Sequence, residues 1–229
     1  MKNIKKILLI MAMTMALGTS AFAASGFEFI LNVPLGAGIF MPPKEYKDAG
    51  VKGGAGFDAG VSAQLGYMFQ VVNGFGISAL VELGYAHDTY AMTFPAYYYQ
   101  APSDVKVSLS LDSFQLGLLP KFNIGAFAIG IGGGVKVPLG GSQTAKVGDA
   151  KETVKYAMGD VLGLFSPPVI GYIKATFDYS IFFMDNLAFN VGLYLGGDIA
   201  KQDDGLGGKI NYSSFDIGVE LGLKFGPRA

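Results

Sequence analysis

Hydrophobic side chains alternate with polar or very small ones along the stretch Ser213–Phe225. One face of an extended strand here carries only apolar side chains: Phe215, Ile217, Val219, Leu221, Leu223 and Phe225. The opposite face carries charges and glycines: Asp216, Gly218, Glu220, Gly222 and Lys224. The pattern predicts a strand with one apolar surface and one polar or bare surface.

The same period of two recurs seven more times upstream. The eight predicted strands are Gly26–Phe40, Ala55–Gln70, Phe75–Tyr90, Asp112–Phe122, Ala126–Leu139, Val169–Phe183, Leu187–Asp198 and Tyr212–Phe225. Most exceed the five or six residues usual in globular strands, and they match the roughly 9 to 11 tilted residues that cross a bilayer. An even number of antiparallel strands is typical of bacterial membrane barrels.

Glycine lies on the polar face of these strands, and this decides which face points inward. The second strand carries Asp58, Gly60, Ser62, Gln64 and Gly66 opposite its apolar side chains. Because glycine suits places where space is tight, we expect the polar face to line the interior and the apolar face to contact lipid. A soluble barrel would show the reverse. The predicted fold is all-β, an eight-stranded antiparallel transmembrane up-and-down β-barrel.

Short and long connections alternate along the chain. Tight turns are predicted at Val72-Asn73-Gly74, Asn123-Ile124-Gly125 and Met184-Asp185-Asn186. The longer connections are Met41–Gly54, Met92–Leu111, Gly140–Pro168 and Ile199–Asn211. Outer-membrane barrels place short turns in the periplasm and long loops outside. A girdle of phenylalanines is predicted at the periplasmic end: Phe27, Phe69, Phe75, Phe122, Phe127, Phe183, Phe189 and Phe225.

The first 23 residues have the layout of a secretory signal peptide, with Lys2, Lys5 and Lys6, an apolar run and Ala21-Phe22-Ala23. We therefore expect residues 1–23 to be removed and residues 24–229 to form one barrel domain. The apolar run is too short to span a bilayer. Without the three signal lysines, 14 basic residues face 18 acidic ones, which argues against a nucleic-acid partner. The chain has no cysteine, which excludes disulfide and thiolate chemistry.

The predicted barrel resembles the eight-stranded outer-membrane proteins of the OmpX and OmpA transmembrane-domain type over its whole length. Leu118-Leu119-Pro120-Lys121-Phe122 is similar to the proline-containing end of their fourth strand. The last strand, ending at Phe225, resembles the signal read by the barrel assembly machinery, although Gly226-Pro227-Arg228-Ala229 follows it here. The resemblance implies a location in the bacterial outer membrane. No peptidoglycan-binding domain follows the barrel, so wall tethering is not expected.

Ten charged residues are predicted to point into the barrel. They are Glu28, Asp58, Glu82, Asp178, Asp216 and Glu220 with Lys121, Lys136, Lys174 and Lys224. Since an eight-stranded barrel is just wide enough to be filled by side chains, we expect these groups to pair across the lumen and plug it. Glu28 and Lys224 are expected to pair at the seam between the first and last strands, and Gln64 to face Glu82. The alternative is a conducting or proton-sensitive lining.

Two long loops carry candidate contact residues. Asp149 and Glu152 form an acidic variant of a capping box, and the spacing of apolar residues predicts a helix over 150–164. Met158, Leu162 and Phe165 would then cover the barrel mouth, or form a wall of a hydrophobic ligand site as in the OmpW-like barrels. In the other loop, Tyr97, Tyr98 and Tyr99 either recognise a surface partner or pack against neighbouring loops.

The sequence offers little support for an enzyme. His87 is the only histidine, and Asp88 follows it. Strand parity places His87 toward the lipid or the outer interface, and no serine motif supplies a partner. Gly130–Gly134 lies inside a strand with no helix after it, so it is not a phosphate-binding loop. No catalytic, cofactor-binding or metal-ligating residue is therefore predicted.

The function predicted is that of an outer-membrane surface protein with a plugged interior, displaying loops for adhesion, host contact or envelope integrity. The alternative is an OmpW-like conduit for small hydrophobic molecules. The expected partners are the lipid bilayer, the barrel assembly machinery, and host surface molecules or small apolar solutes.

Overall fold

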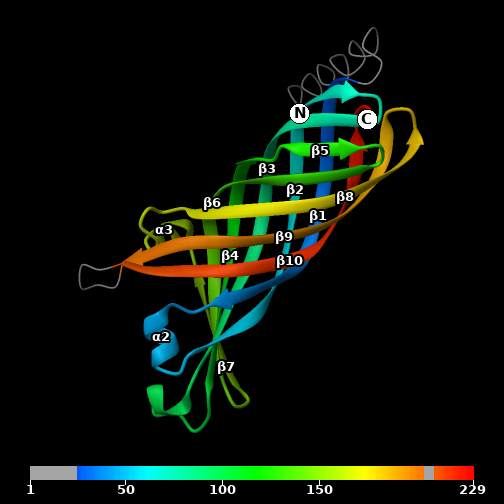
Figure 1. The fold of residues 1–229 in the computed structure, drawn as a ribbon. Coiled ribbons are helices and arrows are strands. Elements are labelled where there is room, and N and C mark those ends of the chain that lie inside the picture. Colours follow the sequence, from blue (N-terminus) through cyan, green and yellow to red (C-terminus); the bar gives the residue numbers. More distant parts are fainter. Residues whose placement is uncertain (1–24, 204–208) are drawn as a thin grey trace, which may run out of the picture.

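The computed structural model describes residues 25–203 and 209–229, so the predicted signal peptide lies outside the described residues. The chain forms a closed antiparallel barrel with strongly tilted strands (Figure 1). The strands are β1 Gly26–Met41, β2 Lys52–Val72, β3 Phe75–Phe94, β4 Val105–Leu118, β5 Lys121–Ile124, β6 Phe127–Val147, β7 Ala150–Tyr156, β8 Ile170–Met184, β9 Leu187–Asp203 and β10 Lys209–Phe225. Three short helices, α2 Lys44–Asp48, η1 Ala96–Tyr98 and α3 Met158–Leu162, lie in the loops.

Eight wall strands close the ring, which confirms the predicted fold. Consecutive strands pair with one another, and β1 pairs with β10 from Phe29↔Phe225 to Met41↔Ser213. β4 and β5 together make one wall strand, because both pair with β3 on one side and β6 on the other. The interruption falls at Pro120, which has no N–H to donate to the ladder. The carbonyl of Pro120 still accepts from the N–H of Ile131 at 3.2 Å.

The two ends of the barrel differ in how the strands are joined. Two-residue turns join β2 to β3, β5 to β6 and β8 to β9. Gly74 and Gly125 adopt φ values of +82° and +59° in two of them, a conformation that glycine reaches without steric cost. Both termini of the described chain lie at this end, while α2, α3 and β7 lie at the other (Figure 1).

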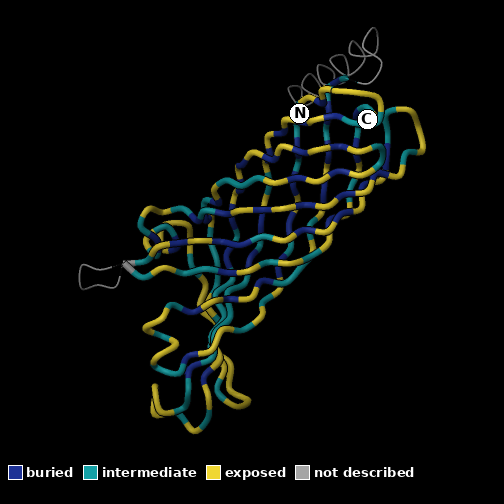
Figure 2. Tube along the Cα trace, viewed as in Figure 1, coloured by how far each residue is buried: buried dark blue, intermediate teal, exposed yellow. Residues whose placement is uncertain are grey.

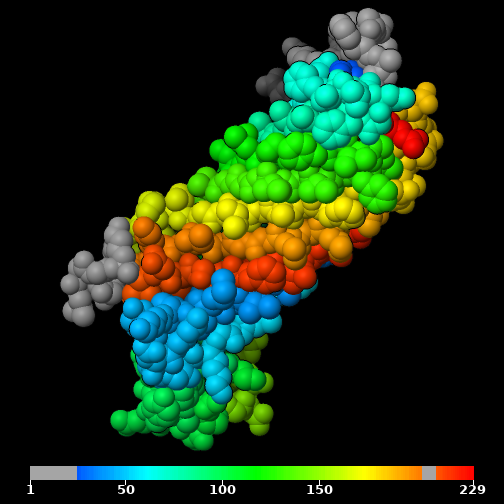
Figure 3. Space-filling view, viewed as in Figure 1, coloured from blue at the N-terminus to red at the C-terminus, as the bar shows by residue number. Residues whose placement is uncertain are grey.

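Exposure alternates along every wall strand (Figure 2). On β10, Leu221 and Leu223 are exposed while Glu220 and Lys224 are buried, and on β8 Ile173 is exposed while Lys174 is buried. Adjacent strands cover the outer wall continuously in the space-filling view (Figure 3). The apolar set therefore faces outward and the polar set inward, as the distribution of glycine predicted.

The strands continue beyond the predicted outer limits, and their polarity inverts where they do so. On β4, the inward positions Val105, Val107, Leu109 and Leu111 are apolar, and the next two inward positions, Ser113 and Gln115, are polar. The outward positions invert in the opposite sense, from Lys106, Ser108 and Ser110 to Phe114, Leu116 and Leu118. Such an inversion fits a barrel whose outer part is surrounded by water and whose remaining wall is surrounded by hydrocarbon. The prediction stopped this strand at Asp112 because the apolar residues change faces there.

The long loop 140–168 differs from its prediction. The predicted helix over 150–164 is wrong, because residues 150–156 form β7 and pair with an extension of β6, from Val147↔Ala150 to Gly141↔Tyr156. Gly148, at φ +56°, makes the hairpin turn where the helix was expected to begin. Only α3 is helical, and the carboxylate of Asp160 accepts from the N–H of Ala157 at 2.9 Å.

Among the described residues, none of the helices is long and apolar enough to cross a membrane.

The inside-outside assignment can be tested by placing the same charge at two outward positions. Ile131, 63% exposed at mid-wall on β6, faces lipid, so Ile131→Arg should lower the free energy of unfolding by about 2 to 4 kcal/mol. Ser108→Arg, outward on β4 but above the inversion, should cost about 0 to 1 kcal/mol. Denaturant titration of the protein in lipid vesicles measures both, and equal costs would contradict the assignment.

Candidate functional site

The structure places the ten predicted inward charges inside the barrel, and it adds Asp88 and Asp198. All are buried except Asp216, which is half-buried. Their strand positions sort them into three levels. On β3 and β10, Ser78 and Lys224 lie nearest the short turns, Glu82 and Glu220 in the middle, and Asp88 and Asp216 toward the loops. The levels differ in their balance of charge.

The level nearest the short turns consists of matched pairs. Lys224 Nζ lies 2.6 Å from Glu28 Oε1, next to the seam between β1 and β10, and Lys121 Nζ lies 2.7 Å from Asp178 Oδ2. The Ser78 hydroxyl donates to the other oxygen of Glu28. Each carboxylate here has its own ammonium group, which is the condition for keeping both charges away from water.

The middle level is a bridge across the lumen. Lys174 Nζ lies 2.8 Å from Glu82 Oε1 and 2.6 Å from Glu220 Oε1, so one ammonium joins β3, β8 and β10. Glu82 accepts three further hydrogen bonds, from Gln64 at 3.2 Å, Gln115 at 2.8 Å and Tyr172 at 3.0 Å. Gln64 stands opposite Glu82 as expected, although the turn pairs Val72 with Phe75 after a bulge. With 0–1% of each glutamate exposed, these paired charges are buried at the centre of the barrel.

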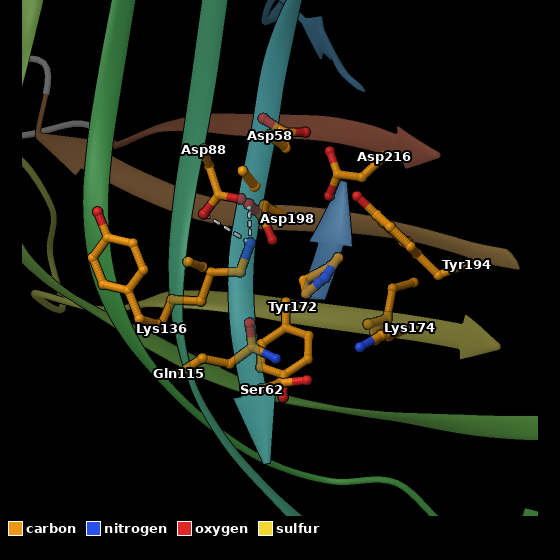
Figure 4. Close-up of a pocket in the computed structure, with 16 residues that line it drawn as sticks. Asp58, Ser62, Asp88, Gln115, Lys136, Tyr172, Lys174, Tyr194, Asp198 and Asp216 are labelled. Atoms are coloured by element: carbon orange, nitrogen blue, oxygen red, sulfur yellow. Dashed lines mark hydrogen bonds and ion pairs between the residues drawn. The ribbon is translucent and has the colours of Figure 1, made fainter. Parts of the chain in front are cut away.

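The outer level is strongly unbalanced. Four carboxylates converge there, Asp58, Asp88, Asp198 and Asp216, which we call the acid ring (Figure 4). Lys136 Nζ lies 2.9 Å from both Asp88 Oδ2 and Asp198 Oδ2. Asp58 accepts from the N–H of Thr89 at 3.0 Å, and Asp216 from the Ser214 hydroxyl at 2.8 Å, but neither has an ion pair in the described part of the chain. A 60 Å³ polar cavity separates this ring from the middle level.

The sequence analysis missed the inward direction of Asp88 and Asp198. Both residues lie within the predicted strands, and the inward alternation of β3 and β9 reaches them, since Asp88 follows Ala86 and Asp198 follows Gly196 with a period of two. Asp88 was considered only as a neighbour of His87, whereas adjacent residues on a strand face opposite ways. Searching the described residues finds no cluster of His, Cys, Asp and Glu arranged to hold a metal ion.

An apolar cavity of 220 Å³ lies in the barrel mouth beyond the acid ring. Seven aromatic rings line it, which we call the aromatic cup: Phe40, Tyr46, Tyr90, Phe94, Tyr99, Phe165 and Tyr212. The rings contact one another one after the next. The ring centroids of Tyr90 and Phe40 are 6.3 Å apart, those of Phe40 and Tyr212 are 5.7 Å apart, and those of Tyr212 and Tyr46 are 6.3 Å apart. The ring of Phe94 contacts two more, with its centroid 6.3 Å from that of Tyr46 and 5.3 Å from that of Tyr99. Asp198 lines this cavity as well as the polar one.

The loop residues predicted to make contacts divide between the cup and the surface. Phe165 is buried, lines the cup beside Leu164 and packs with Val161 of α3, whereas Met158 is exposed and Leu162 is half-buried. Tyr99 lines the cup, and its partial burial raises the pKa of its phenol above the ordinary value.

The other two loop tyrosines combine exposure with packing. The ring of Tyr98 packs against that of Phe94 at a tilt, with the ring centroids 5.3 Å apart. Tyr97 is 71% exposed and donates its hydroxyl to the carbonyl of Ala49 at 2.8 Å. That bond joins the tyrosine loop to the segment around α2.

His87 lies on the outward face and pairs with the neighbouring strand. Its Nδ1 is 2.8 Å from Asp112 Oδ1, the oxygen that also accepts from the hydroxyl of Tyr85. Asp88 points the other way, to Lys136. Histidine, aspartate and tyrosine thus form a polar group at the polarity inversion of β3 and β4, where lipid gives way to water.

No protein-family model matches the chain, and no curated protein matches it either. Solved structures with some likeness include the attachment invasion locus protein Ail of Yersinia pestis, at 11% identity over 86% of this chain and 98% of that one, TM-score 0.37. Neisserial surface protein A has 12% identity over 88% and 98%, TM-score 0.36. The outer membrane protein OprG of Pseudomonas aeruginosa has 14% identity over 90% and 99%, TM-score 0.34. These structural neighbours are small outer-membrane β-barrel proteins, and the architecture described above rests on this chain's own strand pairing.

Proposed function

We propose that the chain is a non-enzymatic surface protein of a bacterial outer membrane, with a barrel closed to ions and loops that make its functional contacts. Adhesion, host contact and envelope integrity are the roles that such display would serve. The observation that carries the proposal is the bridge of Lys174 between Glu82 and Glu220 across the lumen. Assembly through the last strand, with Phe225 as its signal, belongs to the same proposal.

Burial and pairing together support a closed lumen. An ion path needs hydrated space, yet the side chains of Glu82, Lys174 and Glu220 are 0–9% exposed and in direct contact. Separating these pairs would leave buried charges uncompensated, which typically costs about 3 to 5 kcal/mol. The network is therefore expected to stay closed on the time scale of ion passage.

The tyrosine loop supports display at the surface. Tyr97 and Tyr98 keep 71% and 45% of their surface exposed while their loop is held against Ala49 and Phe94. A tyrosine that is already held in place loses little conformational entropy on binding, which makes it a good anchor for a partner. A protein or glycan on a host cell would fit such a surface.

The aromatic cup supports a second candidate function, passage of small hydrophobic molecules. A cavity of 220 Å³ exceeds the roughly 150 Å³ that accommodates benzene in an engineered protein core. A molecule taken up there would have to leave through the wall into the lipid, since the charged network lies below.

The closed lumen predicts no steady conductance from the refolded protein in a planar bilayer. Replacing the bridge by alanines, Glu82→Ala with Lys174→Ala and Glu220→Ala, should open a salt-dependent path, because three long side chains leave the centre together. Val191→Ala, outward on β9, serves as the control and should stay silent. Steady conductance from the unmodified protein would contradict closure.

Display through the tyrosine loop predicts that bacteria carrying Tyr97→Ser with Tyr98→Ser adhere several-fold less to cultured epithelial cells. Lys151→Ser, exposed on β7, is a matched change in another loop. An antibody to an added tag measures the amount of each variant on the cell surface, and adherence is compared at equal amounts. Unchanged adherence of the double variant would exclude this loop as the adhesive surface.

The conduit predicts that liposomes containing the protein take up an apolar fluorescent dye faster than empty liposomes. Leu164→Trp, which fills the cup, should lower the rate of dye uptake toward that of empty liposomes. Val154→Trp, exposed on β7, should leave it unchanged. Equal rates with and without protein would remove the conduit.

A further inference from the structure

The excess of carboxylates over lysines inside the barrel increases from the short turns to the loops. Near the turns each lysine pairs with one carboxylate, and in the middle Lys174 pairs with two glutamates. In the acid ring, Lys136 pairs with two of the four aspartates. The uncompensated negative charge thus accumulates directly beneath the aromatic cup. Isolated buried carboxylates are costly, so this level favours an additional positive charge.

Asp198 connects the acid ring to the cup. It is 2% exposed, lines both cavities, and accepts through Oδ2 from Lys136 at 2.9 Å and from the cup residue Tyr90 at 2.6 Å. Its other oxygen, Oδ1, is buried and has no hydrogen-bond partner among the described residues. An acceptor without a donor remains at the boundary between the two cavities.

The carboxylates of Asp58 and Asp216 converge on a bare stretch of backbone. A Cβ added at Gly38 would lie 2.6 Å from Asp58 Oδ2 and 3.1 Å from Asp216 Oδ1. Gly38 is the inward position of β1 next to Phe40 of the cup. The glycine therefore keeps space between two carboxylates that lack an ion pair in the described chain, immediately below an aromatic wall.

We propose that the aromatic cup and the acid ring together bind a small organic cation, an amine or quaternary ammonium on an apolar body. The aromatic faces attract a cation through their quadrupoles, and the carboxylates of the acid ring add attraction from below. The apolar body displaces water from the cup, whose volume of 220 Å³ holds one substituted ring. An anion would be repelled, and a neutral apolar molecule would gain nothing from the acid ring.

This site goes beyond loop display and is independent of it. If the lumen is closed, the cation cannot move further into the barrel, so it would bind at the mouth without passing the bridge at Lys174. The chemistry resembles that of aromatic cages for alkylated ammonium groups, in which aromatic rings surround the charge and acidic groups support it.

Two probes of similar size separate charge from hydrophobicity. Benzyltrimethylammonium carries the cation, and benzyl alcohol carries the same ring without charge. Titration calorimetry of the full barrel in lipid nanodiscs, with empty nanodiscs subtracted, should give at least tenfold tighter binding of the cation. The difference should largely persist in added salt, because most carboxylates of the acid ring are buried and salt screens buried charges much less than exposed ones.

Paired variants locate the site. Tyr212→Leu removes a ring from the cup and should weaken binding of the cation about tenfold, whereas Tyr67→Leu, on the lipid face of β2, should not change it. Asp198→Asn should weaken it at least as much, with Glu152→Gln in the exposed β7 hairpin as its charge-matched control. Circular dichroism and heat-modified gel mobility establish that each variant is a folded barrel. If Asp198→Asn fails to fold, the Tyr212 pair still decides.

Equal affinity for the two probes, or tighter binding of benzyl alcohol, would overturn the proposal and leave a neutral apolar site. Binding of benzyltrimethylammonium that is insensitive to Tyr212→Leu would also overturn it, because the cation would then be held elsewhere. Either result would leave the predictions for conductance and adherence, and the proposed function that they test, unchanged.

Discussion

The structure depends on one constraint: backbone and side-chain polar groups cannot face hydrocarbon without a partner. A closed ring of strands satisfies every ladder position, and the pairing of β1 with β10 removes the two edges that an open sheet would expose. Apolar side chains such as Ile131 and Ile173 then cover the outside. The polar residues that alternate with them have to point inward, so the charges of the lumen follow from the lipid outside.

A narrow interior turns this set of charges into an ordered network. The rings of Tyr172 and Tyr194 lie over Gly117 and Gly218 of other wall strands, and the lysines reach across the lumen to carboxylates on other strands. Glycine provides the space, and ion pairing offsets the loss of hydration. The charged groups at the level of Lys174 are buried and paired for this reason, while the acid ring above it keeps carboxylates in excess. The proposed plug and the proposed cation site thus arise from the same alternation.

The same constraint explains the mouth of the barrel. Once the strands leave the membrane, water contacts their outer face, and the inward face can become an ordinary apolar core. Leu111, buried next to Ser113 on the same face of β4, marks the change. Val161 and Phe165 from the long loop and Ile170 of β8 complete that core. The aromatic cup and the acid ring meet at this boundary, and Asp198 belongs to both cavities.

The sequence by itself determined the fold and the direction of most side chains. A period of two with glycine on the polar face is a local property, and it predicted eight strands, a polar lumen and the inward direction of Glu82, Lys174 and Glu220. Tertiary structure decided what depends on partners distant in the chain. The β6–β7 hairpin replaced a helix because pairing of residues 141–147 with 150–156 outweighs local helical spacing. The aromatic cup combines rings from β1, β3, β10 and three loops, and only closure of the barrel places them above the acid ring.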